Sequence, residues 1–514
     1  MLNKTKSSEG IFRKEKLKFN DFGVFLCGGP FKMHTIKKFI DCIAAMGYNS
    51  MRWEVGAYLS FDDDKRLNYM TGRYTKEQMQ DIDGYALSKG IELIPCAQMF
   101  GHLSYIWSVK GYSDLFDTRE VFEVDNPGVY DLIKKIILNL KAVFHSKRIH
   151  LGFDETVNLG LGKYLEDHGY VEAGELYVRH LKKVLAIADE CGVSCEIWGD
   201  MYKSFVRKYR KKSPICTKDY AAEFPKNVKI IEWFYEWYSR EELRDIFSLF
   251  KGVNDLAYCD GANCWAEFSS HNWHSINSYE NHIAACEEFG INTFLVSIWY
   301  DSRGEQSVFS VLPSLFHCSI LAHGQVFDDN CIALFQEMFG IKYEDFMSLD
   351  LMIRDIPYQI YPLTDSLLFA DLLRDGSEKD FSLKEGYIEK YNKLSNVKTK
   401  DYQLIFDSTA KLAQLLSVKA TLGFEIVQAY KSKDIEKLMR CNESIVLCIS
   451  LLDDFFAAFS ERYLEEYTDF DFHIHCNRIG GIRQNLLFSN RRLSEYIDGK
   501  IEKIDELEEQ IKML

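Results

Sequence analysis

The chain has 514 residues and a formal net charge of −15, with 47% hydrophobic and 27% charged side chains. This length predicts more than one domain, and this composition is typical of a soluble globular protein. The acidic balance argues against nucleic acid or an anionic membrane surface as the main partner, since both select basic faces.

The first twenty residues are polar and lack the apolar core of a signal peptide. No apolar run reaches the length of a membrane span, about 18 residues. The 14 cysteines are scattered and form no CxxC pair. That pattern is typical of buried free thiols in a reducing compartment. We therefore expect a cytoplasmic protein that holds no metal and no cofactor.

Short apolar segments alternate with amphipathic ones through the first 325 residues. We predict strands at Gly23–Cys27, Ser50–Val55, Ile91–Gln98, Arg148–Phe153, Ser194–Gly199, Val228–Phe234, Leu256–Trp265 and Thr293–Trp299. We predict helices between them, such as those at Thr35–Met46, Lys76–Lys89, Pro127–Phe144, Glu172–Cys191, Arg240–Phe250 and Ser278–Phe289. Eight strand–helix units predict a (β/α)8 barrel. A doubly wound sheet also alternates, but no Gly-x-Gly-x-x-Gly follows the first strand.

The end of the chain has a different character. All eight tryptophans lie at or before Trp299, and no proline follows Pro362. Apolar residues then recur at helical spacing, for example at Leu412, Leu415 and Leu416. We therefore predict a catalytic barrel over residues 1–325 and an α-helical domain over residues 326–514.

Two adjacent carboxyl groups end the fourth predicted strand, in His150-Leu151-Gly152-Phe153-Asp154-Glu155. Alternation along a strand would put His150, Gly152 and Asp154 on one face. Neighbouring carboxyl groups disfavour joint ionisation, so one of the pair holds its proton near neutral pH. A glycosidase needs such an acid beside an anion. An Asp-Glu at a strand end is also typical of a helix cap followed by a solvated acid.

The active site of a barrel of this kind lies at the carboxyl ends of its strands. Acidic and aromatic residues gather at these predicted ends: Glu54, Gln98, His102, Asp154, Glu155, Trp198, Asp200, Trp233, Tyr235, Trp265, Glu267, Trp299, Asp301 and Glu305. Aromatic rings stack on the apolar faces of sugars, and carboxylates accept from sugar hydroxyls. The predicted rim therefore favours a saccharide pocket.

Several motifs resemble glycoside hydrolase family 20, the β-N-acetylhexosaminidases. They are the His-x-Gly-x-Asp-Glu of residues 150–155, the third-strand segment 94–102, the Trp-x-Asp-Met of residues 198–201, the Trp-x-Asp of residues 299–301 with Glu305, and the Arg-x-Gly-Gly of residues 478–481. The closest resemblance is to the branch without an N-terminal accessory domain, which includes bacterial exo-hexosaminidases and hexosaminidase D. Its members have a barrel followed by a helical region.

The resemblance implies a retaining, substrate-assisted reaction, in which the substrate's own acetamido oxygen is the nucleophile. Glu155 falls on the family's general acid/base. Asp154 falls on the carboxylate that accepts from the acetamido N–H and stabilises the oxazolinium intermediate. Tyr235 is our choice for the hydroxyl that holds the acetamido oxygen, with Tyr238 as the alternative. The substrate would be an oligosaccharide or glycoconjugate with a terminal β-linked N-acetylglucosamine or N-acetylgalactosamine.

The resemblance also implies a wider binding site: His102, His150, Trp198, Trp265, Trp299, Asp301 and Glu305. Glu305 would accept from a non-reducing-end hydroxyl and so favour exo cleavage. In one place the chain departs from the family. Many members carry an arginine at the end of the first strand, where this chain reads Leu26-Cys27-Gly28-Gly29-Pro30. Glu54 or Gln98 would replace it, and the preference between the two amino sugars stays open.

Two other functions fit some of these residues. One is a metal-dependent barrel hydrolase with His102, His150, Asp154 and Glu155 around zinc, although zinc sites usually show closer histidine spacing. The other is a non-catalytic sugar-binding barrel, against which the intact acid pair argues. The apolar stripe of residues 501–514 fits a helix packed on its own domain or a homodimer contact.

Overall fold

A computed structural model describes residues 10–205, 218–253, 255–301, 303–352, 361–374 and 379–513. The chain divides into two compact units. The first holds residues 1–262, 275–300 and 314–328, and the second holds residues 263–274, 301–313 and 329–514. The long segment of the second unit begins at residue 329, close to the domain boundary that we predict between residues 325 and 326.

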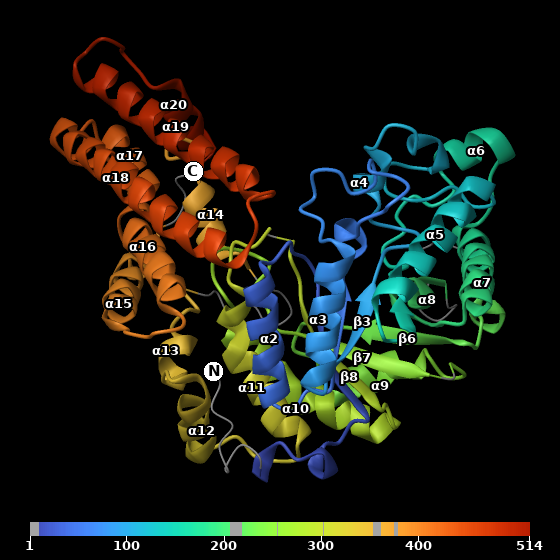
Figure 1. The fold of residues 1–514 in the computed structure, drawn as a ribbon. Coiled ribbons are helices and arrows are strands. Elements are labelled where there is room, and N and C mark those ends of the chain that lie inside the picture. Colours follow the sequence, from blue (N-terminus) through green and yellow to red (C-terminus); the bar gives the residue numbers. More distant parts are fainter. Residues whose placement is uncertain are drawn as a thin grey trace. The chain divides into compact units, whose positions relative to one another are not determined.

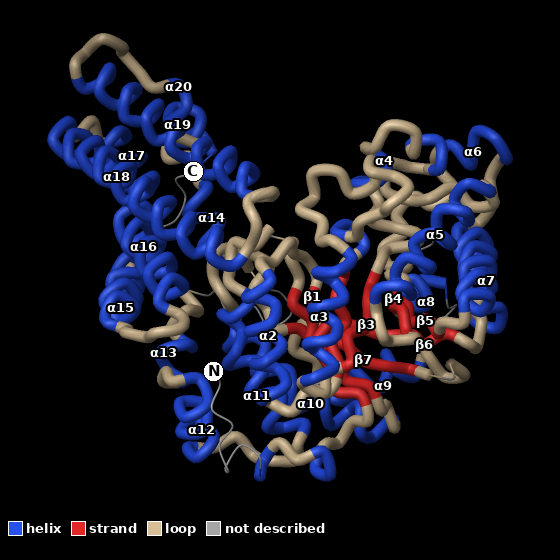
Figure 2. Tube along the Cα trace, viewed as in Figure 1, coloured by secondary structure: helices blue, strands red, loops and turns tan. Residues whose placement is uncertain are grey.

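A closed barrel of eight parallel strands forms the centre of the first unit, in the order β1 to β8, and β8 pairs with β1. The strands are β1 Asp21–Leu26, β2 Ser50–Glu54, β3 Glu92–Cys96, β4 Arg148–His150, β5 Ser194–Trp198, β6 Val228–Trp233, β7 Leu256–Gly261 and β8 Thr293–Ile298. Figures 1 and 2 show these strands gathered together, with helices outside them. The predicted (β/α)8 barrel is confirmed.

Helices connect the strands, and one capping pattern is visible in the sequence. Helix α3 begins with a capping box, in which the Thr75 side chain accepts from the Gln78 N–H. The helices are α2 Met33–Ala45, α3 Lys76–Ser88, α4 Ser104–Trp107, α5 Pro127–Val143, α6 Lys163–His168, α7 Ala173–Cys191, α8 Asp200–Phe205, α9 Arg240–Ser248, α10 Asn272–Phe289 and α11 Leu312–Ala322. Short 3-10 turns lie at Lys14–Lys16, Gly56–Tyr58, Ser113–Leu115, Ala221–Glu223 and Val308–Val311.

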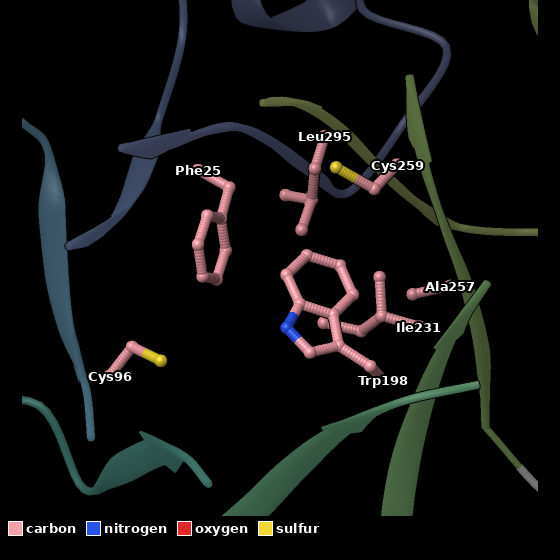
Figure 3. Packing of buried hydrophobic residues seen from close by; sticks show 7 residues of the cluster. All are labelled: Phe25, Cys96, Trp198, Ile231, Ala257, Cys259 and Leu295. Atoms are coloured by element: carbon pink, nitrogen blue, oxygen red, sulfur yellow. The ribbon is translucent and has the colours of Figure 1, made fainter. Parts of the chain in front are cut away.

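The interior of the barrel is filled by side chains from several strands. Figure 3 shows Trp198 of β5 extending toward Phe25 of β1 and Leu295 of β8. The Phe25 and Trp198 ring centroids lie 4.6 Å apart. Strands covered on both faces need apolar residues at nearly every position, which explains their continuous apolar runs.

The same barrel also contains a buried ionic network. Arg52 of β2 is fully buried, and its guanidinium donates to Asp21 of β1 (Nη2 to Oδ2, 2.7 Å) and to Glu196 of β5 (Nη2 to Oε1, 2.9 Å). Arg148 of β4 also pairs with Asp21, at 2.6 Å. The network therefore joins four strands through charge-assisted hydrogen bonds.

The second unit is helical after residue 329. Its helices are α12 Asp329–Phe339, α13 Tyr343–Met347, α14 Leu363–Phe369, α15 Ser382–Asn396, α16 Gln403–Lys419, α17 Leu422–Lys431, α18 Ile435–Glu466, α19 Phe472–Ile497 and α20 Asp505–Met513. Among the described helices, none combines the length and the apolar character that crossing a membrane requires.

Candidate active site

The segment after β4 turns sharply. The strand ends at His150, three residues before the predicted end, and Gly152, Phe153 and Glu155 have φ of 72°, 73° and 44°. These left-handed angles interrupt the pleat, so the predicted alternation of faces is wrong beyond His150. A Cβ on Gly152 would lie 1.7 Å from Gln98 Oε1. A side chain at this position would therefore have to displace Gln98.

The turn places Asp154 in a nearly closed environment, with 9% of the residue exposed. Gln98 Nε2 donates to Asp154 Oδ1 over 3.1 Å, and His102 Nε2 lies 3.3 Å from Oδ2. Burial alone would raise the pKa of Asp154, but the hydrogen bond and charge of His102 and the amide of Gln98 lower it. Asp154 is therefore held as an anion.

Glu155 differs from its neighbour, because its side chain is 55% exposed. Its Oε2 lies 3.6 Å from His102 Nε2, and its backbone N–H donates to Asp200 Oδ2 over 3.0 Å. The imidazole of His102 thus lies within reach of both carboxyl groups. The hydrogen bond to Asp154, opposed by burial, raises the pKa of His102 to about 9. This imidazole is a cation at neutral pH.

Asp200, at the predicted rim after the fifth strand, is not among the site residues that the family resemblance implies. Burial, followed by the charge of Asp154, raises its pKa to about 7. This carboxyl group belongs to the first residue of α8, just after β5, and its Oδ2 accepts from the Glu155 N–H. The Trp-x-Asp-Met motif could have identified Asp200 as a neighbour of the acid pair, because β5, which precedes this aspartate, pairs with β4.

Three of the predicted aromatic residues come together in the first unit. The ring centroids of Trp198 and Trp299 lie 5.6 Å apart, and those of Tyr235 and Trp299 lie 6.3 Å apart. Burial raises the pKa of Tyr235 well above its usual range, so its hydroxyl keeps its proton. Trp198 is 1% exposed. Together these rings form an apolar group at the ends of β5, β6 and β8.

His150 lies deeper than the rest of the motif and is fully buried. Its Nδ1 accepts from the Gly152 N–H over 3.1 Å, and its ring packs against Phe25 and Trp198. Burial lowers its pKa to about 4. In this structure the predicted substrate-binding histidine is a neutral core residue that supports the turn after β4.

The two residues expected to replace the first-strand arginine have different surroundings. Gln98 is engaged with Asp154 through its amide nitrogen. Glu54 is half-buried at the end of β2 and accepts from the Cys27 thiol over 3.3 Å. Glu54 therefore lies beside the strand end where the family's arginine would stand, while Gln98 orients the anion.

Three predicted site residues, Trp265, Asp301 and Glu305, belong to the second unit. Asp301 is exposed and Trp265 is half-buried. Glu305 is 3% exposed and pairs with Arg478 of α19. Burial and the charge of Asp365 raise the pKa of Glu305 well above its usual range, against the opposing charge of Arg478.

The loop that carries Glu305 is also held by its backbone. Arg462 of α18 donates through Nη2 to the carbonyl oxygens of Gly304 (2.9 Å) and Glu305 (2.6 Å). Arginines of two different helices therefore fix this loop within the second unit, and nothing in the strand-end pattern pointed to either contact.

The side chains around the acid pair do not form a complete metal site. Among the residues that the structure describes, no group of three or more His, Cys, Asp or Glu side chains is arranged to hold a metal ion. His102 lies close to Asp154 and to Glu155, but His150, the other histidine of the zinc alternative, points its Nδ1 at a backbone N–H. A catalytic zinc site needs three protein ligands that converge on the metal and leave one position open.

A pocket of about 640 Å³ lies beside the acid pair in the first unit. Its walls come from the segments that follow β4 and β5: Glu155, Thr156, Val157, Asn158, Leu159, Leu161, Tyr170, Val171, Ala173, Asp200 and Met201. This volume is within the range of ligand sites in proteins.

Both parts of the chain match family models. Residues 28–294 match the glycosyl hydrolase family 20 catalytic domain, and residues 363–514 match the glycoside hydrolase 20C C-terminal domain. The barrel model alone spans just over half of the chain.

Individual relatives are more distant. Hexosaminidase D of Homo sapiens is 22% identical over 188 residues, which cover 35% of this chain and 38% of that protein. Beta-hexosaminidase 3 of Arabidopsis thaliana is 25% identical over 198 residues, covering 35% and 36%. This chain therefore matches less than two fifths of the length of these curated relatives. Among solved structures, the N-acetyl-beta-hexosaminidase of Streptomyces plicatus, in complex with Thio-NAglucal, has a TM-score of 0.49 at 15% identity, over 67% of this chain and 72% of that one.

Proposed function

The chain belongs to glycoside hydrolase family 20, and we propose that it is an exo-acting β-N-acetylhexosaminidase. The proposed reaction releases a terminal, non-reducing, β-linked N-acetylglucosamine or N-acetylgalactosamine with retention of configuration. One observation carries the proposal: a cationic imidazole, His102, lies beside a buried anion, Asp154, and an exposed carboxyl group, Glu155, at the end of a barrel strand.

Glu155 is the proposed general acid and base. Its exposed side chain can reach the glycosidic oxygen and protonate it as the bond to the anomeric carbon breaks. In the second step the same carboxylate takes a proton from water as the water attacks the anomeric carbon. The Asp200 carboxylate fixes the backbone of Glu155 through its N–H, which limits the positions that the acid can take.

Asp154 is the proposed partner of the substrate's acetamido group. As the acetamido oxygen attacks, positive charge develops on its nitrogen, and an ionised carboxylate at the N–H stabilises that charge. The low pKa of Asp154 suits this role, because an anion is present before the reaction begins. Gln98 and His102 hold the two carboxylate oxygens and so orient the group.

The surrounding residues would bind and orient the sugar. Trp198, Trp299 and Tyr235 would wall the acetamido pocket, and the Tyr235 hydroxyl would donate to the acetamido oxygen. Glu305 would accept from a hydroxyl at the non-reducing end. The absence of the first-strand arginine leaves Glu54 as the nearest candidate for an additional hydroxyl contact.

The decisive assay measures hydrolysis of aryl β-N-acetylglucosaminide and β-N-acetylgalactosaminide by wild type, Glu155→Gln and Asp154→Asn. We expect Glu155→Gln to lose about 100- to 10,000-fold in kcat/KM on poor leaving groups, since it removes the acid. Asp154→Asn should lose about 100- to 1,000-fold, since it removes the charge that stabilises the intermediate.

The matched control is Glu77→Gln, an exposed glutamate in the first turn of α3, which should leave the rate unchanged. NMR of the first-formed sugar should show the β anomer. A wild-type protein that is inert on both substrates, with its fold intact by circular dichroism, would contradict the proposal and favour a sugar-binding barrel.

A further inference from the structure

The pocket beside Glu155 has an unusual wall. Three of its apolar residues, Val157, Leu161 and Tyr170, are 65%, 52% and 67% exposed. Exposed apolar side chains are normally scattered, and a group of them around one cavity marks an interaction site. Leu159 and Met201 continue the same wall inside the protein, where they are 3% and 7% exposed.

Polar side chains are few in the walls of this pocket, and its two carboxyl groups lie next to each other. Glu155 and Asp200 are joined by the hydrogen bond described above. Thr156 is 3% exposed, and its hydroxyl has no hydrogen-bond partner among the described residues. A buried hydroxyl without a partner is costly unless a bound molecule satisfies it. The pocket thus presents a polar end around Glu155, and its other walls are mainly apolar.

We propose that this pocket receives the leaving group of the substrate, and that the leaving group is an apolar alkyl or aryl alcohol. The inference rests on the proposed function, because it takes Glu155 as the acid. The glycosidic oxygen must lie against the Glu155 carboxyl to receive its proton, so the group attached to that oxygen starts at the polar end. The C–O bond breaks, the proton passes to the alcohol oxygen, and water supplies the hydroxyl of the released sugar.

A second sugar is a poorer match for these walls. A pyranose unit carries several hydroxyl groups, and each one loses its hydrogen bonds to water on entering an apolar pocket. Besides Glu155 and Asp200, the walls offer only Thr156, Asn158 and the Tyr170 hydroxyl as side-chain partners. An alkyl chain loses no hydrogen bonds there and gains from leaving water.

The test is a series of methyl, butyl and hexyl β-N-acetylglucosaminides. These alcohols differ little in acidity, so chain length changes binding and not the chemistry of departure. Complete burial of one methylene is worth about fourfold in kcat/KM. We therefore expect wild-type kcat/KM to rise at least tenfold from methyl to hexyl, mainly through a lower KM.

Leu161→Ser should reduce that rise to about threefold or less, while hydrolysis of the methyl glycoside stays within twofold of wild type. Leu138→Ser is the matched control, because Leu138 lies on α5 with a similar exposed fraction, 48%, and does not line the pocket. Leu138→Ser should keep the full increase in kcat/KM from the methyl to the hexyl glycoside. Tyr170→Ser, at another residue of the wall, should likewise reduce the rise from methyl to hexyl.

Different failures have different meanings. A wild-type protein that hydrolyses all three glycosides equally well would overturn the inference and leave the proposed function standing. Cleavage of N,N′-diacetylchitobiose with a higher kcat/KM than the hexyl glycoside would also overturn the inference and leave the proposed function standing. So would a Leu161→Ser variant that hydrolyses the methyl and hexyl glycosides as the wild type does. A protein that is inert on every glycoside would overturn both.

Discussion

The arrangement of the acid pair depends on Gly152, a residue with no side chain. Its φ of 72° starts the turn after β4, and its missing Cβ leaves the space that Gln98 occupies. Gln98 in turn orients Asp154. A single glycine therefore connects the backbone conformation with the position of the proposed anion.

Gly152→Ala should both destabilise the protein and reduce its activity. The left-handed angle costs about 1 kcal/mol for any residue with a Cβ, and the clash with Gln98 adds about 1–3 kcal/mol. Displacement of Gln98 should lower kcat/KM at least tenfold. Gly169→Ala is the matched control, since Gly169 has a φ of 75° with open space around it. Gly169→Ala should cost only the left-handed angle, about 1 kcal/mol, as measured by denaturant unfolding. Equal effects of Gly152→Ala and Gly169→Ala would refute this account.

His102 should set the acid limb of the pH profile. Its cation and hydrogen bond lower the pKa of Asp154 against burial, which acts in the opposite direction. In His102→Gln the pKa of Asp154 should rise, so the activity that needs the anion is lost at a higher pH. We expect the acid limb of kcat/KM to move upward by about one pH unit.

The control for this change is His145→Gln, which removes another histidine paired with a carboxylate, that of Asp83. It should leave the acid limb in place. An unchanged limb in His102→Gln would mean that a group other than Asp154 controls it.

At the scale of elements, strand ends were the least predictable feature. We predicted β4 to reach Phe153 and β7 to reach Trp265, but these strands end at His150 and Gly261. Apolar residues continue beyond both ends, so composition alone cannot show where ladder pairing stops. The backbone leaves the sheet where side chains of the proposed site are presented, as is usual for barrel enzymes.

Helix α18 contributes one arginine to the Glu305 loop, and its removal should loosen that loop. Arg462→Met leaves the buried carbonyl oxygens of Gly304 and Glu305 without this donor. We expect unfolding of the second unit to become easier by about 1–3 kcal/mol. If Glu305 binds substrate as proposed, KM should rise more than kcat falls.

The matched control for the helix is Arg483→Met, which breaks the exposed pair of Arg483 with Asp453. Exposed pairs contribute about 0–1 kcal/mol, so stability and KM should hardly change. A loss of kcat without a change in KM in Arg462→Met would argue against a role of this loop in binding.

At the level of the whole molecule, ion pairs as well as apolar packing join the strands of the barrel in the first unit. Arg52, Asp21 and Glu196 meet inside it, and Arg148 joins them from β4. Despite burial, the neighbouring arginines lower the pKa of Asp21 and Glu196. Groups with lowered pKa stabilise the fold above their unfolded pKa, near 4, and lose that contribution as the pH falls.

Arg52→Met should therefore cost about 3–5 kcal/mol at pH 7, because it leaves two buried carboxylates without their main partner. The cost should shrink below pH 4, because the unfolded chain takes up protons on these carboxyl groups there and the native ion pairs then contribute less to stability. Denaturant unfolding at pH 7 and pH 3.5 measures both values. Lys37→Met, which removes an exposed pair with Asp81, is the control and should cost less than about 1 kcal/mol. Equal costs at the two pH values would contradict the ionic explanation.

The class of the fold could be predicted from the sequence alone. Apolar segments alternating with amphipathic ones predicted the barrel, which the structure confirms, and the acids and aromatic residues at predicted strand ends gave the candidates for the site. The family's motifs also picked out Asp154 and Glu155 as the acid pair. These features are local, so spacing along the chain carries them.

How those residues act on one another depends on the tertiary structure. Contacts between separate elements raise the pKa of Asp200, make His102 a cation close to two carboxyl groups, and place His150 in the core. The pocket wall that Leu161 and Tyr170 form also depends on segments that come together only in the folded chain. Burial and the distances between charges depend on which strands become neighbours, and no spacing within one segment records that.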